Sequence, residues 1–232
     1  MINYDFFTTQ NNCKVINNQL AVIYPSADNK IPMLKKQNID LENLSYLGFQ
    51  NIRKQDNRNP EIQTVGYFLQ DSKFDGVRRR PWNYVSTLAQ YKQSLTPDFS
   101  CYSDIAKEEQ WASIYLNRLI GAYWQTQGLV VIPTITWGNE ETFDFCFEGV
   151  EQGSVIAVST IGTAKNKKMF MTGFIRMCEV IKPEKVICYC NPYPEMYLYA
   201  DILVVEYEGS RALREAKNRP VDGQLSFDLE VA

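Results

Sequence analysis

Two acidic residues, Asp98 and Glu206, each end a short apolar segment that has the pattern of a buried β-strand. A carboxylate held in that position can exchange a proton with a substrate or bind a divalent cation such as Mg²⁺. Each could equally cap a helix or pair with a neighbouring cation. We therefore take Asp98 and Glu206 as candidate catalytic residues, with Mg²⁺ as the cofactor that this chemistry would use.

Other polar residues occupy the ends of the neighbouring expected strands. In parallel α/β folds these ends lie along one edge, where loops gather and ligands bind. We therefore expect a ligand-binding rim to which the following residues contribute: Ser100, Thr136, Trp137, Ser159, Thr160 and Asn191.

The segment STIGTAKNKK, which begins at Ser159, combines a strand end, a glycine-containing turn and a lysine-bearing helix start. Free amides at a helix start favour anions, and glycine allows a ligand to approach the backbone closely. Lys165 is therefore a candidate phosphate contact. The spacing matches neither the P-loop nor the GxGxxG motif, so this segment alone does not identify a nucleotide site.

Arg118 lies in the apolar stripe of an expected helix over residues 104–127, next to Asn117. An unpaired buried guanidinium is costly, so Arg118 must reach solvent or meet a partner, and pairing with a nearby Asp or Glu is the structural interpretation. The functional interpretation makes Arg118 a catalytic residue and Asn117 a ligand contact. We expect Ser103 or Asp104 to cap this helix.

The hydrophobic pattern predicts the fold that would bring these residues together. Five short apolar segments are typical of strands buried on both faces of a sheet, namely SLTPDFS, GLVVIPTITW, SVIAVSTIG, KVICYCN and ADILVVEYE. Expected helices at 104–127, 140–149, 166–181 and 192–199 separate them, which implies crossover connections between parallel strands. We predict an α/β fold with a mostly parallel sheet and helical crossovers, either a three-layer sandwich or a partial β/α barrel.

The chain divides into three expected parts. Residues 1–45 are rich in Asn and Gln and form an irregular N-terminal segment packed on the main domain, with short strands such as QLAVIYP. Residues 46–217 form the α/β domain, which begins with the strand-like segments LSYLGFQNI and TVGYFLQD. Residues 218–232 form a C-terminal tail.

Composition excludes several classes of protein. The chain contains no histidine, so a histidine-dependent triad, a histidine-ligated zinc and an HxE deaminase site are excluded. No apolar run is long enough to cross a bilayer, and the first residues lack the pattern of a secretory leader. We therefore expect no membrane partner and a cytoplasmic location.

The net charge of −3 gives no overall attraction to nucleic acid. Two local basic patches remain, at Arg78–Arg80 and Lys165–Lys168, through which nucleic acid could bind. Short runs of this kind are usually solvated surface.

The chain resembles the uncharacterised family known as domain of unknown function 4417, which occurs in bacteriophages, prophages and integrative elements of Gram-positive bacteria. The matching stretches are NKIPMLKK, LTPDFSCYSD, NRLIGAYWQTQGLVVIPTITWGNEETFDFCFEG and VIAVSTIGT, and they span about residues 29–163. The resemblance implies a mobile-element origin and a compact α/β domain. The family supplies no established catalytic residues that could be carried over to this chain.

The C-terminal tail contains the hexapeptide QLSFDL, residues 224–229. This order resembles the peptide by which bacterial replication and repair proteins dock on the DNA polymerase sliding clamp. Gln224 would supply an amide to a polar subsite, while Leu225, Phe227 and Leu229 would fill apolar pockets. The alternative is a C-terminal edge strand, because the apolar residues alternate as they would in a half-buried strand.

Three functions remain open. The first is a phage or mobile-element accessory protein that acts on host replication or defence through protein binding, with the tail docking on the clamp or on another host protein. The second is an enzyme acting on a nucleotide or nucleic-acid phosphate, with Asp98 and Glu206 as acid/base or Mg²⁺ ligands and Arg118 or Lys165 holding the phosphate. The third is a counter-defence protein that sequesters a nucleotide signal or blocks an immune complex.

Overall fold

The computed structural model of the protein describes residues 31–101 and 104–205. Several sequence predictions fall outside these ranges: the strand QLAVIYP, the cap candidate Ser103, the candidate catalytic residue Glu206, and the peptide residues Gln224, Leu225, Phe227 and Leu229. The division into three parts at residues 45 and 217 stays a prediction.

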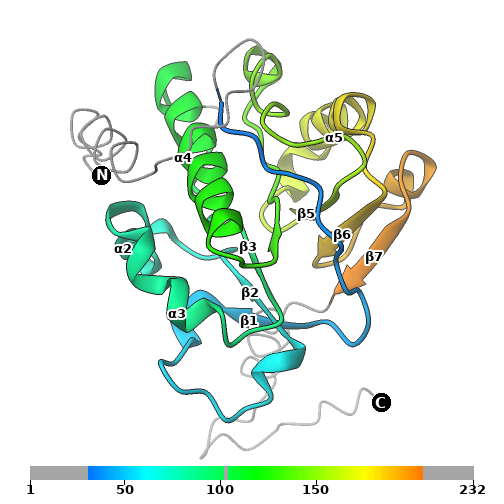
Figure 1. The fold of residues 1–232 in the computed structure, drawn as a ribbon. Coiled ribbons are helices and arrows are strands. Elements are labelled where there is room, and N and C mark those ends of the chain that lie inside the picture. The colour runs from blue at the N-terminus through cyan, green and yellow to red at the C-terminus, as the bar shows by residue number, and fades with distance from the viewer. Residues whose placement is uncertain (1–30, 102–103, 206–232) are drawn as a thin grey trace, which may run out of the picture.

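Within the described residues, the strands form two parallel sheets (Figure 1). The first contains, in spatial order, β1 (Ser45–Gly48), β2 (Gln63–Gly66), β3 (Gln93–Leu95) and β4 (Val131–Ile132). The second contains β5 (Val155–Ser159), β6 (Lys185–Tyr189) and β7 (Ile202–Val205). Every pairing between neighbouring strands is parallel. The predicted α/β class with a mostly parallel sheet is confirmed.

The two sheets join into one curved wall in which spatial order follows chain order. An isolated parallel bridge between Thr134 and Ala157 links the end of β4 to β5. The Tyr46 ring on β1 packs edge-on against Tyr189 on β6, with ring centroids 5.1 Å apart, so the outer strand of the first sheet approaches the middle strand of the second. A doubly wound sheet reverses its strand order at a switch point, whereas a barrel does not. Of the two predicted architectures, the partial β/α barrel is the one observed.

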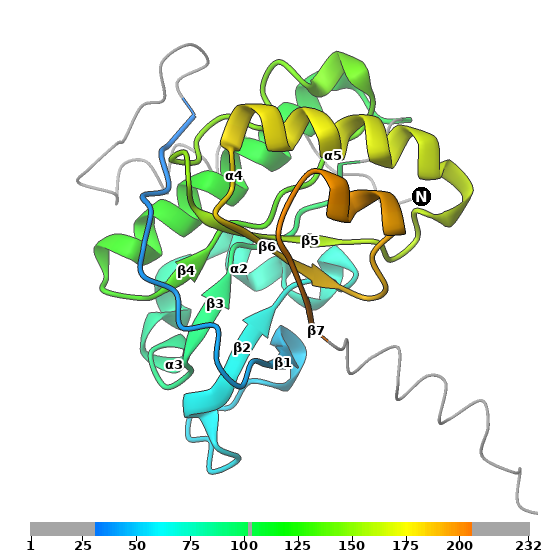
Figure 2. The same ribbon diagram turned by 90° about the vertical axis from the view of Figure 1, so that its right-hand side faces the viewer.

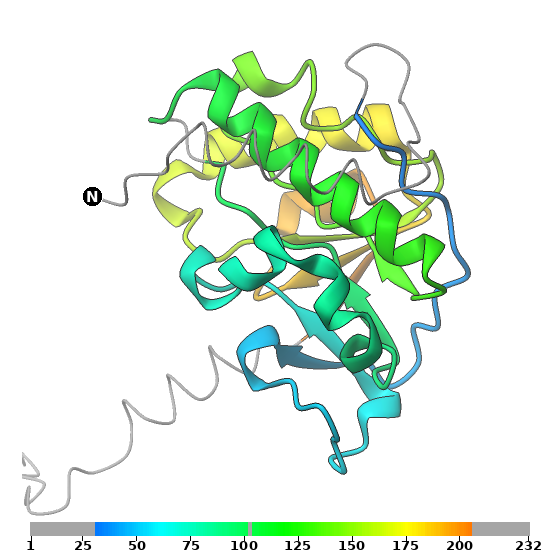
Figure 3. The same ribbon diagram turned by 60° about the vertical axis from the view of Figure 1, so that its left-hand side comes forward.

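Helices cover the outside of this wall (Figures 2 and 3). The α-helices are α2 (Asp75–Arg79), α3 (Val85–Leu88), α4 (Lys107–Thr126) and α5 (Lys167–Ile181). Short 3₁₀ helices occur at Phe49–Asn51, Pro60–Ile62, Asp71–Lys73, Pro81–Tyr84, Glu140–Thr142, Ala164–Asn166 and Pro194–Leu198. The crossovers after β3 and β5 are the long α4 and α5, and the other connections use short helices and turns.

The long helix α4 begins later than the sequence suggests. Its first residue is Lys107, and Ala106 occupies the N-cap position without a side-chain hydrogen bond, so the prediction that Asp104 caps the helix is wrong. Glu108 and Glu109 in the first turn instead place negative charge near the free amides, where the helix dipole favours it. The predicted stripe is otherwise observed, because Ile114 and Leu119 are buried in the core.

Residues 140–149 do not form the predicted helix. They contain a 3₁₀ turn, Glu140–Thr142, followed by further turns. Three phenylalanines alternate in this stretch, and a continuous helix would spread them widely around its circumference. The turns instead bury Phe145 and Phe147 and leave Phe143 half-buried, 5.4 Å from the Phe147 ring. The expected helix at 192–199 is likewise only a 3₁₀ segment, Pro194–Leu198.

Candidate functional site

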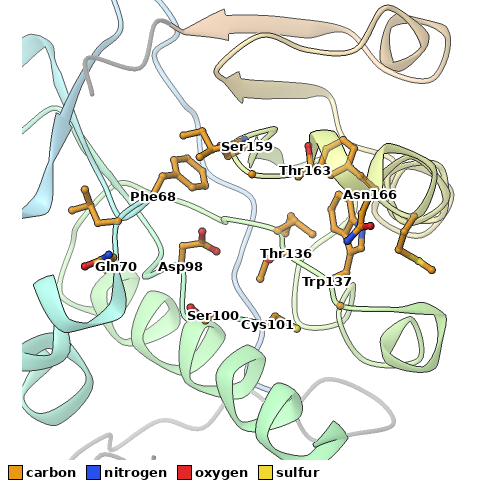
Figure 4. Close-up of a pocket in the computed structure, with 17 residues that line it drawn as sticks. Phe68, Gln70, Asp98, Ser100, Cys101, Thr136, Trp137, Ser159, Thr163 and Asn166 are labelled. Atoms are coloured by element: carbon orange, nitrogen blue, oxygen red, sulfur yellow. The ribbon is translucent and has the colours of Figure 1, made fainter. Parts of the chain in front are cut away.

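A cavity of about 580 Å³ lies at the carboxyl ends of the strands. Segments that follow β2, β3, β4 and β5 line it, together with the start of α5 (Figure 4). Parallel strands direct all of these segments to one edge, as the sequence predicts for a ligand-binding rim. The volume is in the range typical of small-molecule sites.

Asp98 lies three residues beyond β3 and points into this cavity (Figure 4). No side chain or backbone amide of the described residues donates a hydrogen bond to its carboxyl group. Burial raises the pKa of Asp98 to about 7, with a further increase from the negative charge of Asp71 and an opposing effect from Arg118. Because that pKa is close to neutral pH, the group can either donate or accept a proton there.

The neighbouring carboxylate, Asp71, has the opposite environment. Its Oδ1 accepts a hydrogen bond from Ser100 Oγ (2.8 Å), and its Oδ2 accepts one from the Ser100 amide (3.2 Å). Arg78 Nη2 lies 3.5 Å from Asp71 Oδ2, and the same guanidinium stacks over the Phe99 ring. Asp71 is therefore fixed by hydrogen bonds and an ion pair beside Asp98, and two carboxyl groups in such different environments are suited to different roles.

An aromatic wall built around Trp137 forms another side of the cavity. The indole packs against Phe170, with centroids 5.1 Å apart, and edge-on against Phe147 at 5.9 Å. It lies so close to α5 that a Cβ at Gly173 would be 2.1 Å from Trp137 Nε1. Glycine at position 173 therefore leaves the space that the indole occupies.

Phe68, which follows β2, projects into the cavity from the side opposite Trp137 (Figure 4). Its ring centroid lies 5.1 Å from that of Tyr189, which is fully buried. Packing from behind therefore supports the aromatic side chains on both sides of the cavity.

The loop after β5 is held by its own hydroxyl groups. Ser159 Oγ accepts a hydrogen bond from the Ile161 amide (3.1 Å) and donates one to the Tyr189 carbonyl (3.2 Å). The Thr160 hydroxyl donates to the carbonyl of Asn191 (2.8 Å), and the Thr163 hydroxyl lies 2.8 Å from that of Tyr193. Within this loop, Ser159 and Thr163 line the cavity, and Thr160 is a buried support.

Arg118 is fully buried behind the site, and the predicted pairing with a carboxylate is wrong. Its guanidinium donates hydrogen bonds to the backbone carbonyls of Thr134 (3.1 Å), Cys146 (2.9 Å) and Glu148 (3.0 Å), and also to Asn117 Oδ1. Burial lowers its pKa to about 10. We call this arrangement the Arg118 cage, and it ties α4 to the segments that follow β4.

Asn117 supports the segment that leads to Asp98. Its Nδ2 donates a hydrogen bond to the carbonyl of Pro97 (2.8 Å), the residue before Asp98. Neither Asn117 nor Arg118 lines the cavity. Both therefore act on the site through the backbone that they hold.

The structure thus brings together only part of the predicted set. Five of the predicted residues line the cavity: Asp98, Ser100, Thr136, Trp137 and Ser159. Lys165 and Asn191 are exposed and, with Asn117, Arg118 and Thr160, are not part of its lining. Lining residues that the sequence analysis missed include Phe68, Gln70, Cys101, Thr163, Asn166 and Phe170. Phe68 and Gln70 lie in the second half of the predicted strand TVGYFLQD, just beyond the observed β2, so the rule of strand ends could have found them.

The basic patches are less available than their sequence suggests. Arg78 is buried beside Asp71 and Phe99, so it is not a surface residue. Arg79 pairs with Asp75 (2.6 Å), and Lys167 pairs with Glu195 (2.6 Å). Arg80, Lys165 and Lys168 are exposed. Contact with nucleic acid stays a prediction that rests on these last residues.

Residues 31–101 and 104–205 contain no group of three or more His, Cys, Asp or Glu side chains placed to hold a metal ion. None of their helices is both long enough and apolar enough to cross a bilayer.

Comparison with known proteins places the chain among phage-related sequences. Over 126 residues it is 35% identical to the Gene 1 protein of Mycobacterium phage L5, covering 53% of this chain and 55% of that protein. It is 33% identical over 126 residues to the Gene 1 protein of Mycobacterium phage D29, covering 53% of this chain and 47% of that protein. The alignment thus spans about half the length of these curated relatives. No solved structure matches the chain significantly. Residues 24–208 match the family described as "Domain of unknown function (DUF4417)", and the chain therefore belongs to that family.

Proposed function

We propose that the protein is a phage accessory enzyme that transfers protons on a small-molecule substrate in the Asp98 cavity. The phage relatives support the origin, and with it a location in the cytoplasm of the infected host. The observation that carries the activity is the Asp98 carboxyl group, which lies in a cavity of about 580 Å³ without a hydrogen-bond donor from the described residues.

The cavity has the parts that acid–base catalysis needs. A general acid or base works best when its pKa is near the operating pH, and the pKa of Asp98 is raised to about 7. Hydroxyl groups of Thr136 and Ser159 line the same cavity and can orient a polar substrate. Asp98 is therefore the proposed catalytic residue, and Asn117 and Arg118 are positioning residues behind it.

The described lining contains no lysine or arginine. Phosphate groups are usually held by such cations or by backbone amides at helix starts. The start of α5 borders the cavity, but Asp98 and Asp71 oppose an anion there and no cationic side chain compensates, so a substrate without a phosphate at the reacting end is favoured over the nucleotide or nucleic-acid phosphate expected from the sequence. The same observation argues against sequestration of a nucleotide signal in this cavity.

Untargeted metabolite profiling tests the enzymatic proposal. Extract of a mycobacterial cell, as a stand-in for the host, is incubated with wild-type protein, with Asp98→Asn, or with Asp201→Asn. Asp201 is an exposed aspartate that pairs with Lys185, so Asp201→Asn is a matched control for the loss of a carboxylate. We expect wild type and the control to consume the same metabolite and Asp98→Asn to leave it unchanged. No change with any protein, or equal consumption by all three, would contradict the proposal.

A second proposed role, which is compatible with the first, is docking on the bacterial sliding clamp through residues 224–229. The observation that favours it is that the family match ends at residue 208, so the peptide lies outside the matched residues. Gln224 would hydrogen-bond in a polar subsite, and Leu225, Phe227 and Leu229 would fill apolar pockets.

A pull-down with purified clamp tests the docking role. The double variant Gln224→Ala, Leu225→Ala should lose retention, whereas the double variant Val221→Ala, Asp222→Ala, just before the peptide, should keep it. Equal retention of both variants would contradict the docking role without affecting the enzymatic proposal.

A further inference from the structure

The cavity offers flat apolar surfaces on two sides. Trp137 and Phe170 form one side, and Phe68 projects from the opposite side (Figure 4). Phe147, Gly173 and Tyr189 hold these rings from behind, as the ring contacts and the close approach at Gly173 show. Preorganised aromatic faces bind planar rings by stacking, and such stacking is worth about 1–3 kcal/mol per base in nucleic-acid complexes.

The charge around the cavity disfavours anions. Asp98 is the only Asp or Glu of the described lining, and Asp71 adds a second negative charge nearby. The pKa of Cys101 is raised, chiefly by a hydrogen bond with Cys146 and secondly by burial. Cys101 therefore contributes a neutral thiol to the cavity rather than a charged thiolate. Three basic side chains around the site are engaged elsewhere, namely Arg78 with Asp71, Arg118 in its cage and Lys167 with Glu195, and the exposed Lys165 is not part of the lining. The cavity therefore suits a neutral or cationic ligand.

A carboxyl group places two oxygens side by side, and this geometry has a specific complement. The protonated form donates through one oxygen and accepts through the other, whereas the ionised form accepts twice. An amino group next to a ring nitrogen matches both forms. The neutral ring accepts from the acid and donates from its amino group, and the ring protonated on nitrogen donates twice to the carboxylate. The same pairing thus survives transfer of one proton, as acid–base chemistry on that ring would require.

We propose that the ligand of this cavity is a planar, neutral or cationic heteroaromatic compound that carries an amino group next to a ring nitrogen, bound at that edge by Asp98 and stacked on Trp137. This inference deepens the proposed function, because it names the substrate class of the same site. The amide groups of Gln70 and Asn166 line the cavity and are available for other polar substituents.

Binding of matched probe pairs tests the inference directly. The aminated probes are adenine, cytosine and 2-aminopyridine, and their counterparts without the amino group are purine, 2-hydroxypyrimidine and pyridine. Adenosine monophosphate tests tolerance of an anion. Binding is followed by ligand-observed NMR and by calorimetry on the full chain at pH about 6 and about 8, on either side of the Asp98 pKa.

We expect at least one aminated ring to bind at least about tenfold more tightly than its counterpart, which corresponds to about 1.4 kcal/mol. Asp98→Leu, which removes both carboxyl oxygens at similar volume, and Trp137→Ala should each weaken that binding about tenfold. Trp111→Ala should not change it, because Trp111 stacks on Tyr115 in α4 and does not line the cavity. Circular dichroism and thermal melting confirm that each variant is folded.

Failure of this inference is distinguishable from failure of the enzymatic proposal. If no aminated probe binds, or if the counterpart or the phosphate compound binds as tightly as the aminated ring, the inference is wrong. Metabolite turnover that depends on Asp98 would still support the enzyme in that case. Conversely, selective binding of an aminated ring without any turnover in extract would support the substrate class and contradict catalysis.

Discussion

The Arg118 cage and the Asp98 cavity both keep an ionisable group away from bulk water, but they treat it in opposite ways. Arg118 is completely buried and donates to three backbone carbonyls and to Asn117. Asp98 is only partly buried, yet the described residues offer its carboxyl no hydrogen bond. Burying a charged group is costly unless its hydrogen bonds are made inside the protein. The Arg118 cage supplies these hydrogen bonds from within the protein. In the Asp98 cavity they are left for a ligand to supply.

Whether the hydrogen bonds of a buried ionisable group are made within the protein distinguishes structural from functional residues better than residue type does. Both residues are expected at or near the rim from the sequence, and both are charged. The satisfied guanidinium fixes the segments that follow β4, and Asn117 beside it fixes Pro97, so the cage determines where Asp98 and Thr136 lie. The unsatisfied carboxyl retains the capacity to react. Variants of the two residues should therefore have opposite effects on stability and on activity.

The largest expected effect is on stability, from Arg118→Met. The substitution keeps an unbranched apolar stem but leaves the Cys146 and Glu148 carbonyls and the Asn117 amide oxygen without their donor, and the Thr134 carbonyl keeps only the 3.5 Å bond from Asn117 Nδ2. Each unsatisfied buried group costs about 1–3 kcal/mol, partly offset by the apolar replacement, so we expect the free energy of unfolding to fall by about 4 kcal/mol. Denaturant unfolding followed by circular dichroism measures it.

Arg176→Met is the matched control for the cage. Arg176 is an exposed arginine on α5 that pairs with Glu179 at 3.0 Å. Exposed pairs of this kind contribute little, so the control should change stability by less than about 0.5 kcal/mol. If Arg118→Met were as mild as this control, the cage would not have the structural role assigned to it.

The sequence predicts the frame of the fold and part of the cavity, and the reasons differ. The apolar, β-branched strands predict a parallel sheet because burial on both faces leaves a clear pattern, and Asp98 follows from the rule of strand ends. A three-layer sandwich and a partial barrel have the same local hydrophobic pattern and differ only in which strands pair. The pattern cannot distinguish them, and the bridge between the end of β4 and β5 in the structure does. The carbonyl partners of Arg118 are backbone atoms, which carry no side-chain signal. The turns at 140–149 also escaped prediction, because tertiary burial of Phe145 and Phe147 overrides local helix propensity.

The second prediction concerns the pH dependence of stability. The pKa of Asp98 is about 7 in the folded protein and 3.8 in its ordinary environment, so between these values the native state keeps a proton that the unfolded chain releases. The protonated Asp98 carboxyl therefore contributes its full stabilisation below pH 3.8, and this stabilisation is lost as the pH rises through about 7. The full difference between the two pKa values corresponds to about 4 kcal/mol of unfolding free energy. Because water in the cavity reaches the carboxyl group, we expect a loss of about 2 kcal/mol.

Asp98→Asn removes this dependence. Relative to the variant, wild type should lose about 2 kcal/mol of unfolding free energy between pH about 4 and about 8, so the variant should be the more stable protein at the alkaline end. The groups that face Asp98, namely Asp71, Arg118 and Cys101, remain in both proteins, and the comparison cancels most of their effect. Denaturant titrations at several pH values give the two curves. Parallel curves would show that Asp98 is ionised like an ordinary surface carboxylate, and the proposed chemical role would lose its basis.

The smallest expected effect comes from Gly173→Ala, which alters the aromatic wall of the cavity without touching either charged group. A Cβ at this position would lie 2.1 Å from Trp137 Nε1, so the indole has to move. Overpacking costs about 1–3 kcal/mol, and alanine returns up to about 1 kcal/mol through its higher helix propensity, so the net loss of stability should be about 1 kcal/mol.

Gly48→Ala is the control, because Gly48 has an ordinary φ of −62° and its Cβ would meet nothing closer than 3.8 Å. Displacement of Trp137 should also weaken binding of any stacked ligand, whereas the control should bind normally. Equal affinity in both variants would show that the position of the indole does not determine binding, and the site would then depend on Asp98 alone.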